Sequence, residues 1–167
     1  VDPTALYIHG AIHKKVPHAR CILHVHSKYA TALSALDDPT LPPIDQNSMR
    51  FFNRVGVYRD FGGMGFKEES EKMATKIGNK KVLLMSNHGV LTTGQTVAEA
   101  FDELYYFEKA CETYLTALST NKKLKIVSDE VAEKTAQEWE DYSTDSKDLH
   151  LKAIRSILDQ EDPSYKN

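Results

Sequence analysis

The sequence predicts an α/β protein in which short strands alternate with helices. Two apolar runs, residues 21–26 and Val82–Met85, are short enough to be typical of buried strands. Apolar side chains recur at helical spacing over residues 97–118, and Thr96 with Glu99 forms a capping box at the start of that segment. With 167 residues, 41% of them hydrophobic and 27% charged, the chain is long enough to bury a core.

The first third of the chain contains clear start and stop signals. Asp2 and Pro3 are typical of a helix start, with an N-cap followed by proline, and Pro17 is typical of the end of that helix. The stretch 37–43 is rich in proline and breaks regular structure. The elements expected here are a helix over 2–15, a strand over 21–26, a helix over 30–36, a short helix over 47–52 and a strand over 55–58.

The remainder continues the alternation after a glycine-rich loop at 61–65. Gly78 is expected to end the next helix, and Asn87-His88-Gly89 is expected to form a turn. We expect the helical tail to cover the domain or a neighbouring subunit; a solvated amphipathic extension is the alternative. The expected elements are a helix over 67–77, strands over 82–85 and 90–93, and helices over 97–118, 129–141 and 146–159.

Charge and composition narrow the classes of partner. With 21 basic and 24 acidic residues the net charge is −3, which gives no reason to expect nucleic acid or an anionic membrane as partner. No apolar stretch approaches the roughly 20 residues that a membrane span needs. Cys21 and Cys111 lie in apolar surroundings far apart in the sequence, so we expect no disulfide and a cytoplasmic location.

Three histidines are the strongest candidates for a functional site. His24 and His26 alternate along one apolar strand, so their side chains point to the same face, and His88 follows the buried run Val82–Met85. A lone histidine in such a run is more often a packed or surface residue. Three neutral imidazoles together can hold a divalent metal and leave a coordination position open, as catalytic sites do. Zinc is the first choice, and manganese, cobalt, nickel or iron are alternatives.

The other histidines have weaker claims. His9 and His13 lie four residues apart and therefore on one face of the first helix. His9 is a candidate ligand or acid–base group because its helix leads directly into the strand of His24. We expect His13 to be solvated, and His18 and His150 to be surface residues in polar contexts.

Several of these motifs, in this order, resemble the class II aldolase/adducin family over about residues 2–118. The pair His-x-His and Asn-His-Gly, in that order, is specific to this family. The segments that carry the resemblance are residues 8–12, 21–26, 82–89, 94–101 and 108–111. We therefore expect a single domain over 1–167, with the family core at 1–118 and a helical extension at 119–167.

The resemblance implies a three-layer α/β/α fold with a central, largely antiparallel sheet. It also implies a divalent metal, usually zinc, on His24, His26 and His88, and a homotetramer with the site at a subunit boundary. Family members cleave or form a carbon–carbon bond next to a carbonyl, epimerise sugar phosphates, or decarboxylate or dehydrate related compounds. The metal stabilises the enolate oxygen that appears when the bond breaks.

Two departures from the family pattern affect the expected chemistry. The acidic residue that family aldolases carry before His-x-His falls on Ala5, so the usual acid–base carboxylate is absent. Asp2, His9 or a residue of another subunit is the candidate replacement. The N-terminal portion of the family, which bears phosphate-binding loops, is expected to be missing, so no phosphate site is assigned.

Tyr58 resembles the proton-donating tyrosine of sugar-phosphate aldolases, because it precedes a Phe-Gly as that tyrosine does. The alternative is that Tyr58 is a buried tyrosine of a strand.

The function that this pattern favours is a metal-dependent lyase acting on a small hydroxy-carbonyl or carboxylate compound. His24, His26 and His88 would hold the metal, while Tyr58 and His9 would move protons. A decarboxylase or epimerase on the same scaffold is one alternative, because the carboxylate is absent. A non-catalytic, adducin-like interaction module is another. A third alternative is a structural metal that joins subunits. This alternative is less well supported, because structural zinc sites normally have four protein ligands and only three candidates are present.

Overall fold

A four-stranded sheet forms the centre of the computed structural model, which describes residues 2–142 and 145–166. The strand order is β1-β4-β3-β2; β4 runs antiparallel to both neighbours, and β2 runs parallel to β3. The expectation of a largely antiparallel central sheet is confirmed. The strands are β1 (Cys21–Val25), β2 (Val55–Tyr58), β3 (Val82–Met85) and β4 (Gly89–Gly94).

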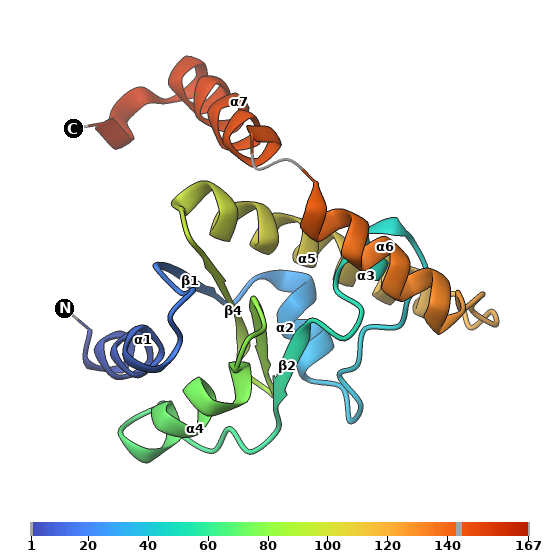
Figure 1. The fold of residues 1–167 in the computed structure, drawn as a ribbon, viewed down its shortest axis with the longest axis horizontal. Coiled ribbons are helices and arrows are strands. Elements are labelled where there is room, and N and C mark those ends of the chain that lie inside the picture. The colour runs from blue at the N-terminus through green and yellow to red at the C-terminus, as the bar shows by residue number, and fades with distance from the viewer. Residues whose placement is uncertain (1, 143–144, 167) are drawn as a thin grey trace.

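Helices cover both faces of this sheet, which gives the three layers expected (Figure 1). Helices α1 and α4 pack against each other on one face, and α2 and α5 pack on the other. In the tail, α6 packs against α3, and α7 packs against the side of α5 that faces away from the sheet. The helices are α1 (Pro3–Lys15), α2 (Lys28–Ser34), α3 (Gln46–Arg50), α4 (Glu68–Ile77), α5 (Val97–Ser119), α6 (Asp129–Asp141) and α7 (Asp145–Glu161), followed by a 3-10 helix at Pro163–Lys166.

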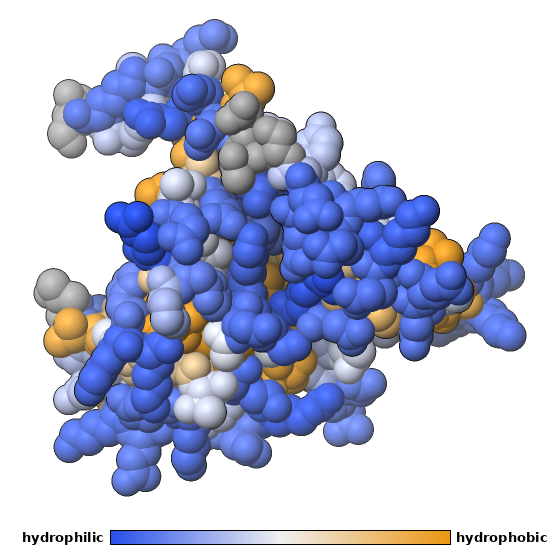
Figure 2. Space-filling view, viewed as in Figure 1, coloured by the Kyte–Doolittle hydropathy of each residue, from blue (hydrophilic) through white to orange (hydrophobic). Residues whose placement is uncertain are grey.

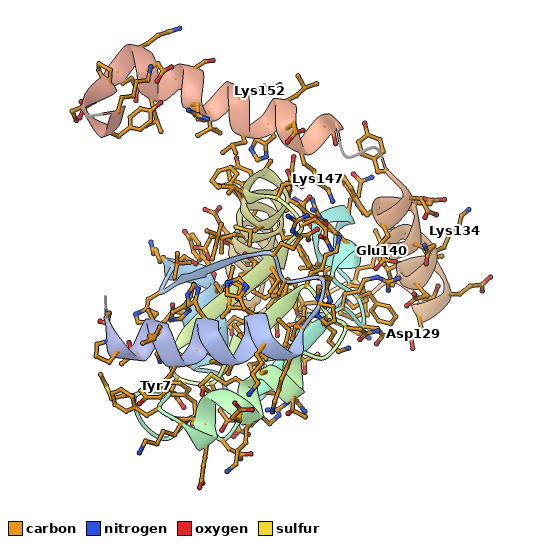
Figure 3. All side chains as sticks on the ribbon, turned by 60° about the vertical axis from the view of Figure 1, so that its left-hand side comes forward. Tyr7, Asp129, Lys134, Glu140, Lys147 and Lys152 are labelled. Atoms are coloured by element: carbon orange, nitrogen blue, oxygen red, sulfur yellow. The ribbon has the colours of Figure 1, made fainter. Side chains whose placement is uncertain are left out.

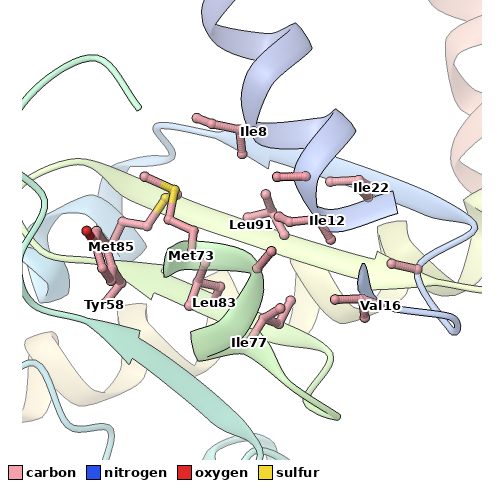
Figure 4. Close-up of a cluster of buried hydrophobic side chains, with 13 residues drawn as sticks. Ile8, Ile12, Val16, Ile22, Tyr58, Met73, Ile77, Leu83, Met85 and Leu91 are labelled. Atoms are coloured by element: carbon pink, nitrogen blue, oxygen red, sulfur yellow. The ribbon is translucent and has the colours of Figure 1, made fainter. Parts of the chain in front are cut away.

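The core consists of two apolar clusters, one on each face of the sheet. Strands β3 and β4 are buried along their whole length, because helices cover them from both sides. This explains why Val82–Met85 is a continuous apolar run rather than an alternating one. Figure 4 shows the cluster between α1, α4 and the sheet, with the labelled side chains Ile8, Ile12, Val16, Ile22, Tyr58, Met73, Ile77, Leu83, Met85 and Leu91.

The start of α2 differs from the expectation for a tertiary reason. The helix begins at Lys28, two residues before the predicted start at residue 30. Ser27, its N-cap, makes no capping hydrogen bond of its own. Instead Glu108 of α5 accepts hydrogen bonds from the Ser27 hydroxyl (2.6 Å) and from the backbone N–H groups of Tyr29 and Ala30 (both 2.8 Å). A carboxylate far along the chain therefore stabilises the orphan donors of this helix.

Other element boundaries shift by one to three residues. Strand β1 ends at Val25, so His26 lies just beyond it. Helix α4 begins at Glu68 because the backbone of Lys67 has φ 41°, outside the helical region. Among the described residues, none of the helices is long and apolar enough to cross a bilayer. Figure 2 shows a face that is mostly polar, with scattered apolar side chains between charged ones.

Replacing Glu108 by alanine should lower the free energy of unfolding by about 1–3 kcal/mol, because part-buried donors at the start of α2 lose their acceptor. Urea denaturation of the full chain measures this change. Glu138→Ala on α6 is the control: it removes one exposed ion pair with Lys134 and should cost about 0.3–0.5 kcal/mol. Equal losses in the two variants would contradict the capping role of Glu108.

Candidate metal centre

Antiparallel pairing brings the three candidate histidines together. His24 lies on β1 opposite Leu91 of β4, and His26 follows the end of β1. His88 lies in the turn that joins β3 to β4. Because β1 and β4 pair in opposite directions, the end of β1 meets the start of β4, and the turn carrying His88 lies beside it.

The imidazole rings direct their Nε2 atoms at one point. The Nε2 atom of His88 lies 3.0 Å from that of His24 and 3.1 Å from that of His26. The Nδ1 atom of His24 lies 2.9 Å from the carbonyl oxygen of Val90. That carbonyl can only accept a hydrogen bond, so Nδ1 carries the proton and Nε2 keeps a free lone pair directed at the other two rings.

This arrangement fits a divalent cation better than a set of hydrogen bonds. His88 has one Nε2 atom close to two other nitrogens, and a single N–H there could point at only one of them. Two ligands of a tetrahedral zinc ion lie about 3.3 Å apart when the Zn–N distances are about 2.0–2.1 Å. Across the described parts of the chain, His24, His26 and His88 are the one group of histidine, cysteine or acidic side chains with ligand atoms this close, within 4.8 Å of one another.

The Asn-His-Gly turn has the residues that this geometry needs. Asn87 has φ 56°, a left-handed conformation that asparagine tolerates, and its backbone N–H donates to the carbonyl of Ser34 at the end of α2. Gly89 lies against the end of β1. A Cβ atom at this position would come within 2.6 Å of the Val25 carbonyl oxygen and 2.8 Å of the His26 ring. Glycine therefore allows the turn to approach His26 closely.

Burial favours the neutral form of two of the three rings, His24 and His88. It lowers the pKa of His88 to about 4, with a further contribution from His24 and His26 nearby. Burial also lowers the pKa values of His24 and His9. Neutral imidazoles are the form that binds metal, so His24 and His88 are prepared for ligation at neutral pH.

The three histidines line a hollow of about 760 Å³ between α1, β1 and the glycine-rich loop. His9 lies on its wall, and so does Ala5, the position on which we expect the family carboxylate to fall. His26 is exposed there, while His24 and His88 are half-buried, so one side of the cluster is open. The lining residues are Asp2, Thr4, Ala5, Ile8, His9, His24, Val25, His26, Gly63, Met64 and His88.

Tyr58 is placed differently from His9. Its side chain is 5% exposed and belongs to the apolar cluster between α1, α4 and the sheet, and it does not line the hollow. Burial raises the pKa of its phenol, as do the nearby charges of Glu69 and Asp60. The structure therefore brings His9, and not Tyr58, to the wall of the hollow.

Glu69 is a residue of this site that sequence reasoning missed. Its two carboxylate oxygens accept hydrogen bonds from the backbone N–H groups of Gly62 (2.8 Å) and Gly65 (2.9 Å). They hold the glycine-rich loop as a wall of the hollow, and the ring of Phe61 in that loop lies 4.0 Å from the ring of His88. An acidic residue in the first turn of a helix is so common that no local pattern indicates this role.

The histidines expected at the surface are only partly exposed. His150 of α7 is half-buried, and its Nδ1 atom lies 2.8 Å from an oxygen of Asp102 on α5. His18 bonds through Nε2 to the carbonyl of Lys80 at 3.1 Å. Both have structural partners and lie outside the residues that line the hollow. Polar sequence context therefore did not predict their exposure.

Residues 2–115 match the family model of the class II aldolase and adducin N-terminal domain. The chain belongs to this family, as the resemblance of its motifs predicted. It is 31% identical to decarboxylase NovR of Streptomyces niveus over 83% of this chain and 51% of that protein. It is 35% identical to human beta-adducin over 72% of this chain and 16% of that protein.

Solved structures share the fold. A crystal structure of an aldolase II superfamily protein from Pseudomonas syringae superimposes with a TM-score of 0.88 and 29% identity, over 100% of this chain and 66% of that one. An L-fuculose 1-phosphate aldolase from Glaciozyma antarctica PI12 gives a TM-score of 0.72 and 30% identity, over 83% of this chain and 51% of that one. The chain thus spans about half the length of decarboxylase NovR and of this aldolase.

Metal-free protein should lose stability as the pH falls from 6.5 to about 4. In this range the unfolded chain takes up a proton on His88, whose ordinary pKa is 6.5, while the folded chain does not until about pH 4. Unfolding midpoints in urea at pH 7.5, 6 and 5 measure the effect. His88→Gln removes this group and should make the pH dependence shallower; an unchanged pH dependence would contradict the assignment.

Proposed function

We propose that this protein is a metal-dependent lyase that cleaves a carbon–carbon bond next to a carbonyl in a small hydroxy-carbonyl or carboxylate compound. The observation that carries the proposal is the convergence of the Nε2 atoms of three histidines that line a hollow of about 760 Å³. His24, His26 and His88 would hold the metal, zinc first, with manganese, cobalt, nickel or iron as alternatives. A bound divalent cation supplies Lewis-acid stabilisation of the negative charge that develops on a carbonyl oxygen.

His9 is our first candidate for proton transfer. It lines the hollow beside Ala5, where the family carboxylate is absent, and burial lowers the pKa of its ring. A neutral imidazole at pH 7 can accept a proton from the substrate and return it. Tyr58 is the second candidate, a phenol that burial keeps protonated at neutral pH. Its place in the apolar cluster makes it the weaker one.

The walls of the hollow support a substrate with polar and apolar ends. Carbonyl, hydroxyl or carboxylate oxygens would point at the histidine cluster. The apolar side chains of Ile8, Val25 and Met64 also line the hollow and would contact an apolar substituent. Such a substrate would suit either bond cleavage or loss of carbon dioxide.

A decarboxylase or epimerase on the same scaffold is the nearest alternative. Loss of carbon dioxide from a 3-keto acid, whose carboxylate lies β to the carbonyl, develops charge on the carbonyl oxygen as aldol cleavage does, without a base that deprotonates a hydroxyl group. Ala5 favours this alternative, because it removes the usual base. The 31% identity to decarboxylase NovR supports it as well.

A non-catalytic interaction module is the second candidate function. The 35% identity to human beta-adducin and the absent carboxylate at Ala5 favour it. The convergent histidines favour the enzyme. The two functions differ most directly in whether the purified protein holds a stoichiometric metal.

We propose that residues 1–167 form one domain of a cytoplasmic homo-oligomer. The resemblance to the family favours a tetramer. We expect neither nucleic acid nor a membrane as partner. Two observations support this setting. A second subunit would cover exposed apolar side chains: Met64 (61% exposed), which lines the hollow, Phe66 (43%), its near neighbour in the sequence, and Leu6 (63%), which follows Ala5 of the hollow wall. Cys21 and Cys111 are free, as expected in a reducing compartment.

Purified protein should contain about one divalent metal per chain, and the double variant His24→Ala/His26→Ala almost none, because two ligands are lost. Elemental analysis measures this. His13→Ala/His18→Ala is the matched control and should keep the metal, since neither side chain lines the hollow. The interaction module would be favoured if the wild-type protein holds no metal and if added zinc, manganese or cobalt does not stabilise it against heat. Chelation that dissociates the oligomer would indicate a structural metal.

With a substrate found in a panel of 2-hydroxy and 2-keto acids, His9→Gln should lower kcat by about 100-fold or more while metal content is retained, because the proton carrier is lost. His13→Gln, one turn along α1, is the control and should keep wild-type turnover. Unchanged turnover in Tyr58→Phe would remove Tyr58 from the mechanism. A metal-loaded protein with no turnover on any compound of the panel would count against the lyase.

A further inference from the structure

Helix α7 is anchored to the rest of the molecule through its first half. Lys147, where this helix meets α5 (Figure 3), lies 3.8 Å from Glu99, and the Nδ1 atom of His150 lies 2.8 Å from Asp102. Beyond this contact every residue from Arg155 to Lys166 is exposed. Figure 1 shows the C-terminal end of α7 well away from the helices that cover the sheet. The second half of the helix is therefore an arm that projects from the domain.

The projecting half continues the apolar stripe of the anchored half. Leu151, Ile154, Ile157 and Leu158 recur at intervals of three and four residues, so they lie on one face of the helix. Leu151 and Ile154 are half-buried, whereas Ile157 is 50% exposed and Leu158 is 43% exposed. Most helical stability in proteins comes from packing of such a face rather than from propensity. The exposed end of the stripe is therefore suited to a partner that packs against it.

Charged side chains line one flank of this stripe. Lys152, Arg155, Asp159 and Asp162 recur at intervals of three, four and three residues, so they follow one another along the helix. The first two are basic and the last two are acidic. Within the described residues no carboxylate lies in ion-pair range of Lys152 or Arg155, while Asp159 pairs with Lys166 at 2.8 Å and stays 38% exposed. The basic end of the flank thus lacks acidic partners in its own chain.

Two copies of this helix have complementary charges when they lie antiparallel. A two-fold axis across such a pair brings the same flank of each helix together in opposite directions. A pairing centred on Ile157 places Arg155 of each copy beside Asp159 of the other, and Lys152 beside Asp162. Flanking ion pairs of this kind determine partner choice and orientation in paired helices. The charge order of α7 therefore favours a second α7 in the antiparallel direction.

We infer that α7 is a self-association element, whose projecting half binds the same half of α7 in a second copy of this chain as an antiparallel helix pair. The pair buries Ile157 and Leu158 of both copies between the two helices. Ion pairs of Arg155 with Asp159 and of Lys152 with Asp162 flank them. Two short helix halves bury less than the roughly 1,200 Å² of a standard interface, so the contact is weak and reversible by itself.

This contact is separate from the subunit contact proposed above. That contact involves Leu6, Met64 and Phe66, on α1 and the segment that follows the glycine-rich loop, whereas the helix pair uses α7 alone. The inference rests neither on the histidine cluster nor on lyase activity. The double variant His24→Ala/His26→Ala should therefore self-associate through α7 as the wild-type chain does.

Sedimentation of the full chain over a wide range of concentration tests the apolar part of the contact. The wild-type chain should associate reversibly, and Leu158→Lys should raise the dissociation constant about tenfold or more, because it places two like charges near the two-fold axis. Leu149→Lys is the matched control: Leu149 is 64% exposed on the opposite side of α7 and should associate as wild type does. Wild-type circular dichroism in both variants would show that the helix is retained.

A charge-reversal pair tests the antiparallel direction. Arg155→Glu alone and Asp159→Lys alone should each self-associate about tenfold more weakly, since each sets like charges beside one another. An equimolar mixture of the two variants should associate again, because each unlike pair now joins opposite charges. A mixture that associates no better than its components would overturn the inference. A monomeric wild-type chain at every concentration would overturn it, and so would wild-type association in Leu158→Lys.

Discussion

The antiparallel pairing of β1 with β4 is the constraint on which the candidate site depends. It places His24 and His26, from the first strand, beside the turn that carries His88, more than 60 residues later. Side chains on one edge of this pairing point at a common place because strand residues alternate with a period of two. A shift of the pairing by one residue would turn His24 to the other face of the sheet, and the cluster would be lost.

Two carboxylates from helices stabilise the surroundings of that cluster through backbone N–H groups. Glu108 binds the start of α2, directly after His26, and Glu69 binds the glycine-rich loop that forms a wall of the hollow. Charged acceptors on backbone donors are among the stronger hydrogen bonds in proteins. The local shape of the site therefore depends on two acidic residues that do not line the hollow themselves.

The two ends of the central strands differ in chemistry. At one end three imidazoles direct Nε2 atoms at one point, and burial lowers the pKa values of His24 and His88. At the other end the buried guanidinium of Arg50 pairs with Asp102 and Glu103 and connects α3 to α5. Burying these charges is costly, and the cost is offset because each has a close partner.

The sequence by itself determined the order and type of the elements and the candidate ligands. The apolar run Val82–Met85, the cap at Thr96 and the His-x-His pair are local patterns, and a short segment of chain contains all the information that each one needs. The tertiary structure alone decided the start of α2, the role of Glu69, the partly buried state of His150 and the buried ion pairs of Arg50. Each of these depends on a contact with another element, most of them more than 40 residues distant, and periodicity and capping rules do not reach that far.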